Sequence, residues 1–211
     1  MPNKQEITDY LIQKYHPVAI LLHGSRARGL SRPNSDWDLF VFVDRDVKDD
    51  GPELWKGESL DIDVVKLPVT KDMFFETFLG TLQKTEVLYE QQGGVQPVLQ
   101  LAKEIYQAPY DLSDKRRRNR KNYFHRLLLR LEGYIDQPEL FFYYLAGFYE
   151  NVFPYWYELK GRWSQPLYVA WLQIQKEDPE YAELVRVLSS AASTKQKLDA
   201  ARQINQRLFP T

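Results

Sequence analysis

Acidic side chains recur at two-residue spacing in two segments that are otherwise rich in apolar residues. Asp36 and Asp38 open the first segment, and Asp61 and Asp63 lie in the second. Alternate residues of a β-strand point to the same face, so each pair places two carboxylates side by side. Mg²⁺ prefers oxygen ligands and is usually held by one or two carboxylates together with substrate phosphates. The pattern therefore favours a metal site that serves displacement at phosphorus.

A Gly-Ser turn precedes the first acidic segment. Gly24 and Ser25 follow the apolar run 18–22, which predicts a strand buried on both faces. The backbone N–H groups of such a turn, with the Ser hydroxyl, can hold terminal phosphates. Gly24 and Gly29 have the spacing of P-loop glycines, but Leu30-Ser31 stands where that motif requires Lys and then Ser or Thr. We therefore predict a phosphate-binding turn that is not a P-loop.

A purely structural interpretation competes with the metal site. In it, Asp36 and Asp38 cap the solvated end of a strand and pair with Arg26 or Arg28. The two arginines could instead contact phosphates, a task that suits the guanidinium group, and we assign that contact to Arg28. Burying several carboxylates together without cations is costly, and a bound metal removes the conflict. The upstream turn and the second acidic segment favour the metal.

The hydrophobic pattern predicts an α+β fold in two parts. Strands are predicted over residues 18–22, 36–43, 58–67 and 86–90, and helices over 4–15, 70–79 and 95–106, with a polar connection over 44–57. From about residue 111 the strand signals stop, and the remaining sequence has helical periodicity and many aromatic residues. We predict a mixed-sheet N-terminal catalytic domain, residues 1–109, followed by a C-terminal helical bundle, residues 110–211.

Composition limits the classes of partner. The 211 residues are 44% hydrophobic and carry a net charge of −1, which predicts a folded protein without a global field for long duplex nucleic acid. The absence of cysteine excludes disulfides and thiolate metal sites. The polar start does not resemble a signal peptide, and no apolar run approaches the roughly 20 residues of a membrane span. We expect a cytoplasmic protein without a membrane partner.

The motifs together resemble a known family. The run His23-Gly24-Ser25-Arg26-Ala27-Arg28-Gly29, then Ser35-Asp36-Trp37-Asp38-Leu39, then an Asp on the next strand is similar to the nucleotidyltransferase fold of the DNA polymerase beta superfamily. The likeness is greatest to minimal and antibiotic nucleotidyltransferases and covers about residues 18–67. It implies that Gly24 and Ser25 contact the phosphates of a nucleoside triphosphate, expected to be ATP, and that Asp36 and Asp38 bind Mg²⁺.

The third carboxylate is either Asp61 or Asp63. In the family fold, its strand is expected to run antiparallel beside the first acidic strand. A later residue then lies nearer the start of that strand, which favours Asp63. The predicted catalytic and metal-binding set is therefore Asp36, Asp38 and Asp63. It would transfer a nucleoside monophosphate to a hydroxyl of a small molecule or protein and release pyrophosphate, and the sequence does not identify that acceptor.

Two further interpretations concern the C-terminal half and its partners. The basic segment 115–121 is either the solvated start of a long helix or a positive wall for triphosphate or an anionic acceptor. Arg118-Asn119 followed by His125 also resembles the ribonuclease motif of HEPN helical domains, which accompany minimal nucleotidyltransferases. The alternative function is accordingly a regulatory or antitoxin-like module that acts on a helical protein partner.

Overall fold

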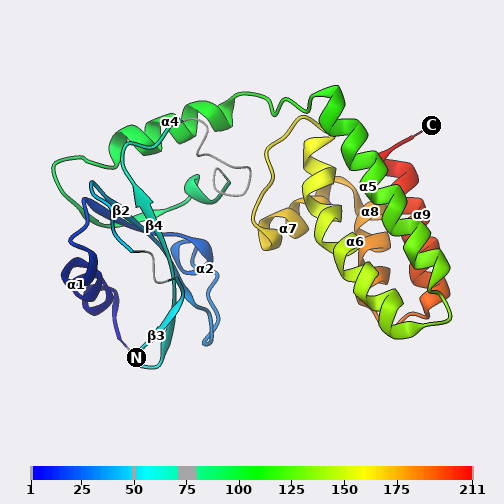
Figure 1. Ribbon diagram of the computed structural model, residues 1–211, viewed down its shortest axis with the longest axis horizontal. Helices are drawn as coiled ribbons and strands as arrows, with labels where there is room; N and C mark the ends of the chain where they lie inside the picture. Colours follow the sequence, from blue (N-terminus) through cyan, green and yellow to red (C-terminus); the bar gives the residue numbers. More distant parts are fainter. Residues whose placement is uncertain (1, 49–50, 71–79, 211) are drawn as a thin grey trace. The chain divides into compact units, whose positions relative to one another are not determined.

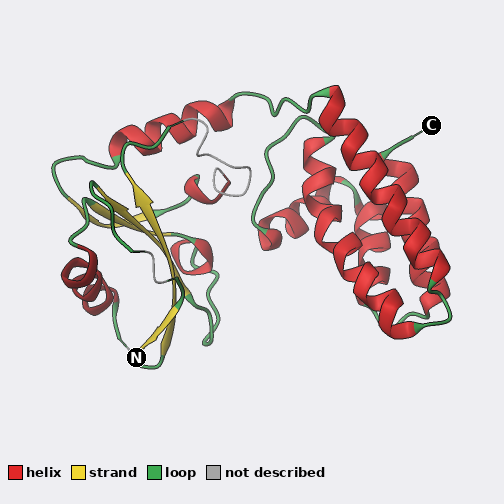
Figure 2. Cartoon of the chain, viewed as in Figure 1, coloured by secondary structure: helices red, strands yellow, loops and turns green. Residues whose placement is uncertain are grey.

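The computed structural model describes residues 2–48, 51–70 and 80–210. The chain divides into two compact units, Met1–Ala108 and Pro109–Thr211, and each is described by itself. Strands occur in the first unit, and the described part of the second is built from helices, so the predicted α+β class is confirmed (Figure 2). The helix predicted over 70–79 lies outside the described residues except at its first position.

The N-terminal unit contains a five-stranded mixed sheet in the order β3-β4-β2-β1-β5 (Figure 1). The strands are β1 (Ala19–Leu22), β2 (Trp37–Val43), β3 (Glu53–Trp55), β4 (Glu58–Lys66) and β5 (Glu86–Glu90). β2 and β4 pair in parallel, and the other neighbouring strands pair antiparallel. Asp38 on β2 therefore lies on a strand that is the direct neighbour of β4, which carries Asp61 and Asp63.

The prediction that residues 44–57 are only a polar connection is wrong, because this segment contains the strand β3. This strand pairs with β4 through a two-residue turn, Lys56-Gly57, in which both residues have positive φ, 48° and 83°. Positive φ at both central positions is typical of the tight turns that join hairpin strands. The strand is short and its central Leu54 is 81% exposed, so it carries no apolar alternation that the sequence could reveal.

Helix α1 (Lys4–Tyr15) covers one face of the sheet. Asn3 caps its first turn in a capping box with Glu6, and the helix ends at His16 in the left-handed region. Its buried apolar side chains pack with the odd-numbered residues of β2, namely Trp37, Leu39, Val41 and Val43. Because side chains alternate along a strand, the even-numbered residues of β2, Asp38 among them, lie on the face opposite α1.

The remaining helices are α2 and α4 in the first unit and α5 to α9 in the second. Their bounds are α2 (Gly24–Ala27), α4 (Gln96–Gln107), α5 (Asp114–Gly133), α6 (Pro138–Glu158), α7 (Leu167–Glu177), α8 (Pro179–Ser189) and α9 (Thr194–Leu208). Buried apolar and aromatic side chains from all five C-terminal helices form one core. Within the described ranges, none of the helices has the length and apolar character that crossing a membrane requires.

One buried ion pair joins the first two helices of the C-terminal unit. The Glu158 side chain is 1% exposed, and both of its oxygens accept hydrogen bonds from Arg120, at 2.8 and 3.1 Å. The Arg120 guanidinium also lies over the Tyr155 ring, 4.8 Å from its centroid. A buried carboxylate that loses its partner is left as an uncompensated charge, so this pair constrains how α5 and α6 pack.

We predict that Arg120→Ala lowers the free energy of unfolding of the C-terminal unit by about 3 to 5 kcal/mol, because it removes two hydrogen bonds and the balancing charge from the buried Glu158 carboxylate. Urea unfolding followed by circular dichroism would measure the change. Arg202→Ala is the matched control, since Arg202 pairs with Glu132 and Asp199 at the surface, and its effect should be a small fraction of the first. Equal effects of the two variants would contradict the prediction.

Candidate active site

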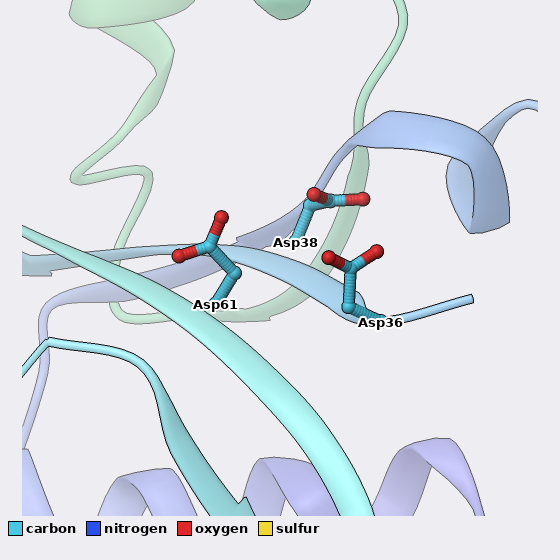
Figure 3. Close-up of side chains that lie close together, drawn as sticks. All are labelled: Asp36, Asp38 and Asp61. Carbon is cyan, nitrogen blue, oxygen red and sulfur yellow. The ribbon is translucent and has the colours of Figure 1, made fainter. Parts of the chain in front are cut away.

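Three aspartates gather on the sheet face opposite α1. Asp36, Asp38 and Asp61 each offer a carboxylate oxygen, and these oxygens all lie within 4.8 Å of one another. Figure 3 shows the three side chains pointing to the same side of their strands. Asp36 directly precedes β2, Asp38 lies within it, and Asp61 lies on β4. Asp36 and Asp61 are exposed, whereas Asp38 is partly buried.

The parallel pairing of β2 with β4 decides which residue joins the pair Asp36 and Asp38. Asp61 is aligned with Asp38, and Asp63 is aligned with Phe40, two residues farther along both strands. The predicted antiparallel direction of β4 relative to β2 is wrong. The argument that favoured Asp63 over Asp61 depended on that direction and no longer holds. Asp61, the alternative left open by the sequence, is the third carboxylate of the group that the described residues form.

Gly24 brings the turn after β1 into direct contact with Asp38. The backbone N–H of His23 donates to the Asp38 carbonyl oxygen at 2.9 Å, and Gly24 follows with a φ of +66°. A Cβ atom at Gly24 would lie 1.8 Å from Oδ2 of Asp38, so no larger residue fits there. The backbone N–H of Ser25 donates to the Asp38 carboxylate. The turn thus fixes the carboxylate and holds its own main chain beside the acids.

Arg26 ties the short helix α2 to the entry of β2. Its guanidinium donates to the carbonyl oxygens of Ser35 and Asp36, at 2.5 and 2.9 Å, and to the Glu58 carboxylate at 3.2 Å. It also lies over the Trp37 ring, 4.2 Å from the centroid. Arg26 therefore holds the main chain that presents Asp36. The structural alternative predicted that Arg26 pairs with the aspartate side chains. The observed hydrogen bonds of Arg26 go instead to two main-chain carbonyls and to Glu58.

Arg28 and His23 pack close to the turn. Nη2 of Arg28 donates to the Gly80 carbonyl oxygen at 3.1 Å. Burial, reinforced by the positive charge of Arg28, lowers the pKa of His23 to about 4, so its imidazole is neutral at physiological pH. The ring stacks on Phe40 at a centroid distance of 4.0 Å. His23 is thus a packed residue at the strand end, and the contact of Arg28 with phosphate stays a prediction.

The electrostatics of the three clustered aspartates, Asp36, Asp38 and Asp61 (the acid group), suit them to binding a cation. Burial, followed by the negative charges of Asp36 and Asp61, raises the pKa of Asp38 to about 6, against the opposing hydrogen bond from Ser25. A carboxylate with a raised pKa in the folded state is unfavourable when it is ionised. Three clustered carboxylate oxygens are also the donor set that Mg²⁺ prefers. The residues present therefore fit a hard divalent cation.

We predict that Gly24→Ala destabilises the N-terminal unit more than Gly29→Ala does. Both glycines have positive φ, +66° and +69°, but a Cβ at Gly29 meets no atom within 4 Å. Gly29→Ala should cost about 1 kcal/mol from backbone strain alone, whereas Gly24→Ala adds the clash with Asp38. Thermal unfolding would measure both variants, and Mg²⁺ binding should weaken only in Gly24→Ala. Similar losses in the two variants would contradict the contact described above.

We predict that the metal-free protein loses stability as pH rises from about 4 through about 6, because the raised pKa of Asp38 favours its protonated form in the folded state. The loss should be about 2 kcal/mol, since each pKa unit corresponds to about 1.4 kcal/mol and solvent screens part of it. Thermal unfolding across this range would show it. Asp38→Asn should make stability nearly independent of pH over this range. An unchanged pH dependence in that variant would assign the effect to other titrating groups.

Comparisons with known proteins bear on the N-terminal unit. Residues 5–93 match a family model described as polymerase beta, nucleotidyltransferase. No curated protein matches the chain. A chain from a crystal structure of a toxin-antitoxin with AMP-PNP is 19% identical, with a TM-score of 0.35, over 50% of this chain and 88% of that chain. A nucleotidyltransferase-like protein from Exiguobacterium sibiricum 255-15 is 13% identical, with a TM-score of 0.41, over 97% of this chain and 72% of that chain.

The matched residues include both parts of the site. Gly24 and Ser25 lie inside the matched range, as do all three clustered aspartates. The family resemblance predicted from the sequence motifs is therefore confirmed by an independent comparison. Residues 5–93 form a polymerase beta-like nucleotidyltransferase domain.

Proposed function

We propose that the N-terminal unit is a Mg²⁺-dependent nucleotidyltransferase that moves a nucleoside monophosphate from a nucleoside triphosphate to a hydroxyl acceptor. The observation that carries the proposal is the group of three carboxylates within 4.8 Å, formed on neighbouring strands of a nucleotidyltransferase domain. The three carboxylates repel one another in the absence of a cation, and a metal bound together with a polyphosphate relieves that repulsion. ATP is the triphosphate we expect.

Asp36, Asp38 and Asp61 would hold the metal. When bound, Mg²⁺ supplies charge neutralisation at the phosphate oxygens and at the leaving group. The chain's own contribution is to fix the carboxylates. The Ser25 N–H and the main chain at Gly24 set the position of Asp38, and Arg26 anchors the backbone beside Asp36. This preorganisation would supply most of the reduction in barrier.

The turn at Gly24 and Ser25 would contact the terminal phosphates. The backbone N–H of Ser25 donates to Asp38, and the Ser25 hydroxyl has no hydrogen-bond partner among the residues that the structure describes. That hydroxyl is therefore the group we assign to a phosphate oxygen, and the guanidinium of Arg28 would contribute a second donor. Because Gly24 has no side chain, its main chain can lie directly against the Asp38 carboxylate, which keeps the turn next to the proposed metal site.

The reaction is an in-line displacement. The acceptor oxygen forms a bond to the α-phosphorus, the bond from that phosphorus to the bridging oxygen breaks, and pyrophosphate leaves with the electron pair. Asp61, the exposed member of the group on β4, would accept the proton from the acceptor hydroxyl. The acceptor would be a small molecule or a protein, and the first test needs no knowledge of which.

We predict that Asp38→Asn and Asp61→Asn each lower transfer by at least about a hundredfold, because each removes a metal ligand. The assay would supply α-labelled triphosphates and Mg²⁺ with a cell extract and measure both pyrophosphate and labelled products. Asp63→Asn is the matched variant, since Asp63 lies on the same strand two residues beyond Asp61. It should retain most of the activity.

Three other results would change the assignment. Activity that is lost in Asp63→Asn and kept in Asp61→Asn would return the third position to Asp63. Full activity in Asp38→Asn would reject the metal site altogether. Mg²⁺ binding without transfer to any component of the extract, together with stable association with a helical protein, would instead favour the regulatory module.

A further inference from the structure

A polar cavity lies between α5 and α6 in the C-terminal unit and contains none of the residues of the acid site. Its volume is about 730 Å³, and it is lined by Asn119, Arg120, Asn122, Tyr123, Arg126, Asn151 and Tyr155. This volume is within the range of sites that hold small molecules. Every lining side chain has a hydrogen-bonding group, so an apolar ligand would leave those groups unpaired.

One wall of the cavity is rigid. Arg120 is held by two hydrogen bonds to the buried Glu158, and its guanidinium lies over the Tyr155 ring. Its charge is balanced by that carboxylate, but its planar guanidinium and the neighbouring aromatic ring remain part of the cavity surface. Planar groups of this kind stack well on a nucleobase.

Arg126 supplies a positive charge to the same cavity. It lies 5.7 Å from the centroid of the Tyr123 ring and forms no ion pair with any acidic side chain of the described residues. The segment 115–121, one to three turns earlier on α5, contains six Lys or Arg among its seven residues. The local field therefore disfavours a cation and attracts an anion, for which a guanidinium offers several donors.

Three asparagine amides complete the lining. Asn119 and Asn122 are exposed on α5 and have no hydrogen-bond partner within the described parts of the chain. Asn151, on α6, donates through Nδ2 to the Gly147 carbonyl oxygen at 2.8 Å, which leaves its Oδ1 as an acceptor. An amide presents a donor beside an acceptor, the pattern that matches the edge of a nucleobase. A simple anion would use only the donor half of each amide, whereas a base edge uses the donor and the acceptor together.

We propose that this cavity binds one nucleotide unit, with its phosphate at Arg126 and its base among the asparagines and the Arg120–Tyr155 wall. The unit is either a free nucleoside monophosphate or part of a single-stranded RNA, because both present the same base and phosphate. The inference is independent of the proposed transfer reaction, since it uses only residues of the C-terminal unit.

The test measures binding to the full chain with EDTA present, so that any metal-dependent binding at the acid group is absent. Fluorescence anisotropy would follow a labelled short single-stranded RNA, and calorimetry would follow AMP and inorganic phosphate. Arg126→Gln is the diagnostic variant. Arg130→Gln is its matched control, because Arg130 is an exposed arginine one turn later on α5 that also lies over a tyrosine ring, at 5.8 Å from Tyr144, without lining the cavity.

Arg126→Gln should weaken binding roughly tenfold, the usual effect of losing a charge-assisted hydrogen bond, while Arg130→Gln should change it less than about twofold. Tighter binding of RNA than of AMP would identify RNA as the source of the nucleotide, and equal affinity would identify the free nucleotide. Binding of phosphate as tight as that of AMP would overturn the proposal, because the base would then contribute nothing. Equal losses in the two variants, or no binding of AMP or RNA, would overturn it as well.

Discussion

The contact between the Gly24 main chain and the Asp38 carboxylate is the constraint on which the N-terminal site depends. The turn after β1 lies so close to β2 that a single added carbon would overlap Oδ2 of Asp38. The hydrogen bond from His23 to the Asp38 carbonyl and the one from Ser25 to its carboxylate hold the two segments at that distance. The turn that we propose to contact phosphate and the acids that we propose to hold the metal are thus placed together by one packing arrangement, and each is positioned only when the other is.

Much of this arrangement follows from the sequence. The two-residue spacing of Asp36 and Asp38 predicts their common face, and the apolar residues between and after them predict a strand with its other face buried. The direction of β4 could not be predicted in the same way, because it depends on β3. That strand has only three residues and an exposed central leucine, and the turn that returns the chain from it uses Lys56, whose positive φ no simple propensity predicts.

The role of Arg26 shows a different limit of sequence reasoning. Guanidinium chemistry suits phosphate, carboxylate and carbonyl partners equally well, so residue type alone does not choose among them. In the structure, the choice is made by the position of Glu58 at the start of β4 and by the Trp37 ring beneath the guanidinium. Both are tertiary neighbours, brought close by the same parallel pairing for which the family resemblance predicted the opposite, antiparallel direction. An error in one strand direction therefore conceals the role of a residue on another element.

The acid group and the buried ion pair of the C-terminal unit resolve the cost of burying charge in opposite ways. Glu158 is almost fully buried, yet Arg120 neutralises it within the chain, so the pair serves packing. Asp38 is partly buried beside two like charges, and its raised pKa indicates that the Ser25 hydrogen bond and the charge of Arg26 compensate its charge only in part. A group that destabilises the fold when ionised is stabilised by whatever cation binds it, so metal binding and the stability of the N-terminal unit must be coupled. The two sites differ in the source of the compensating charge: for Glu158 it is the chain itself, and for the acid group, under the proposed function, it would be a cation from the solvent.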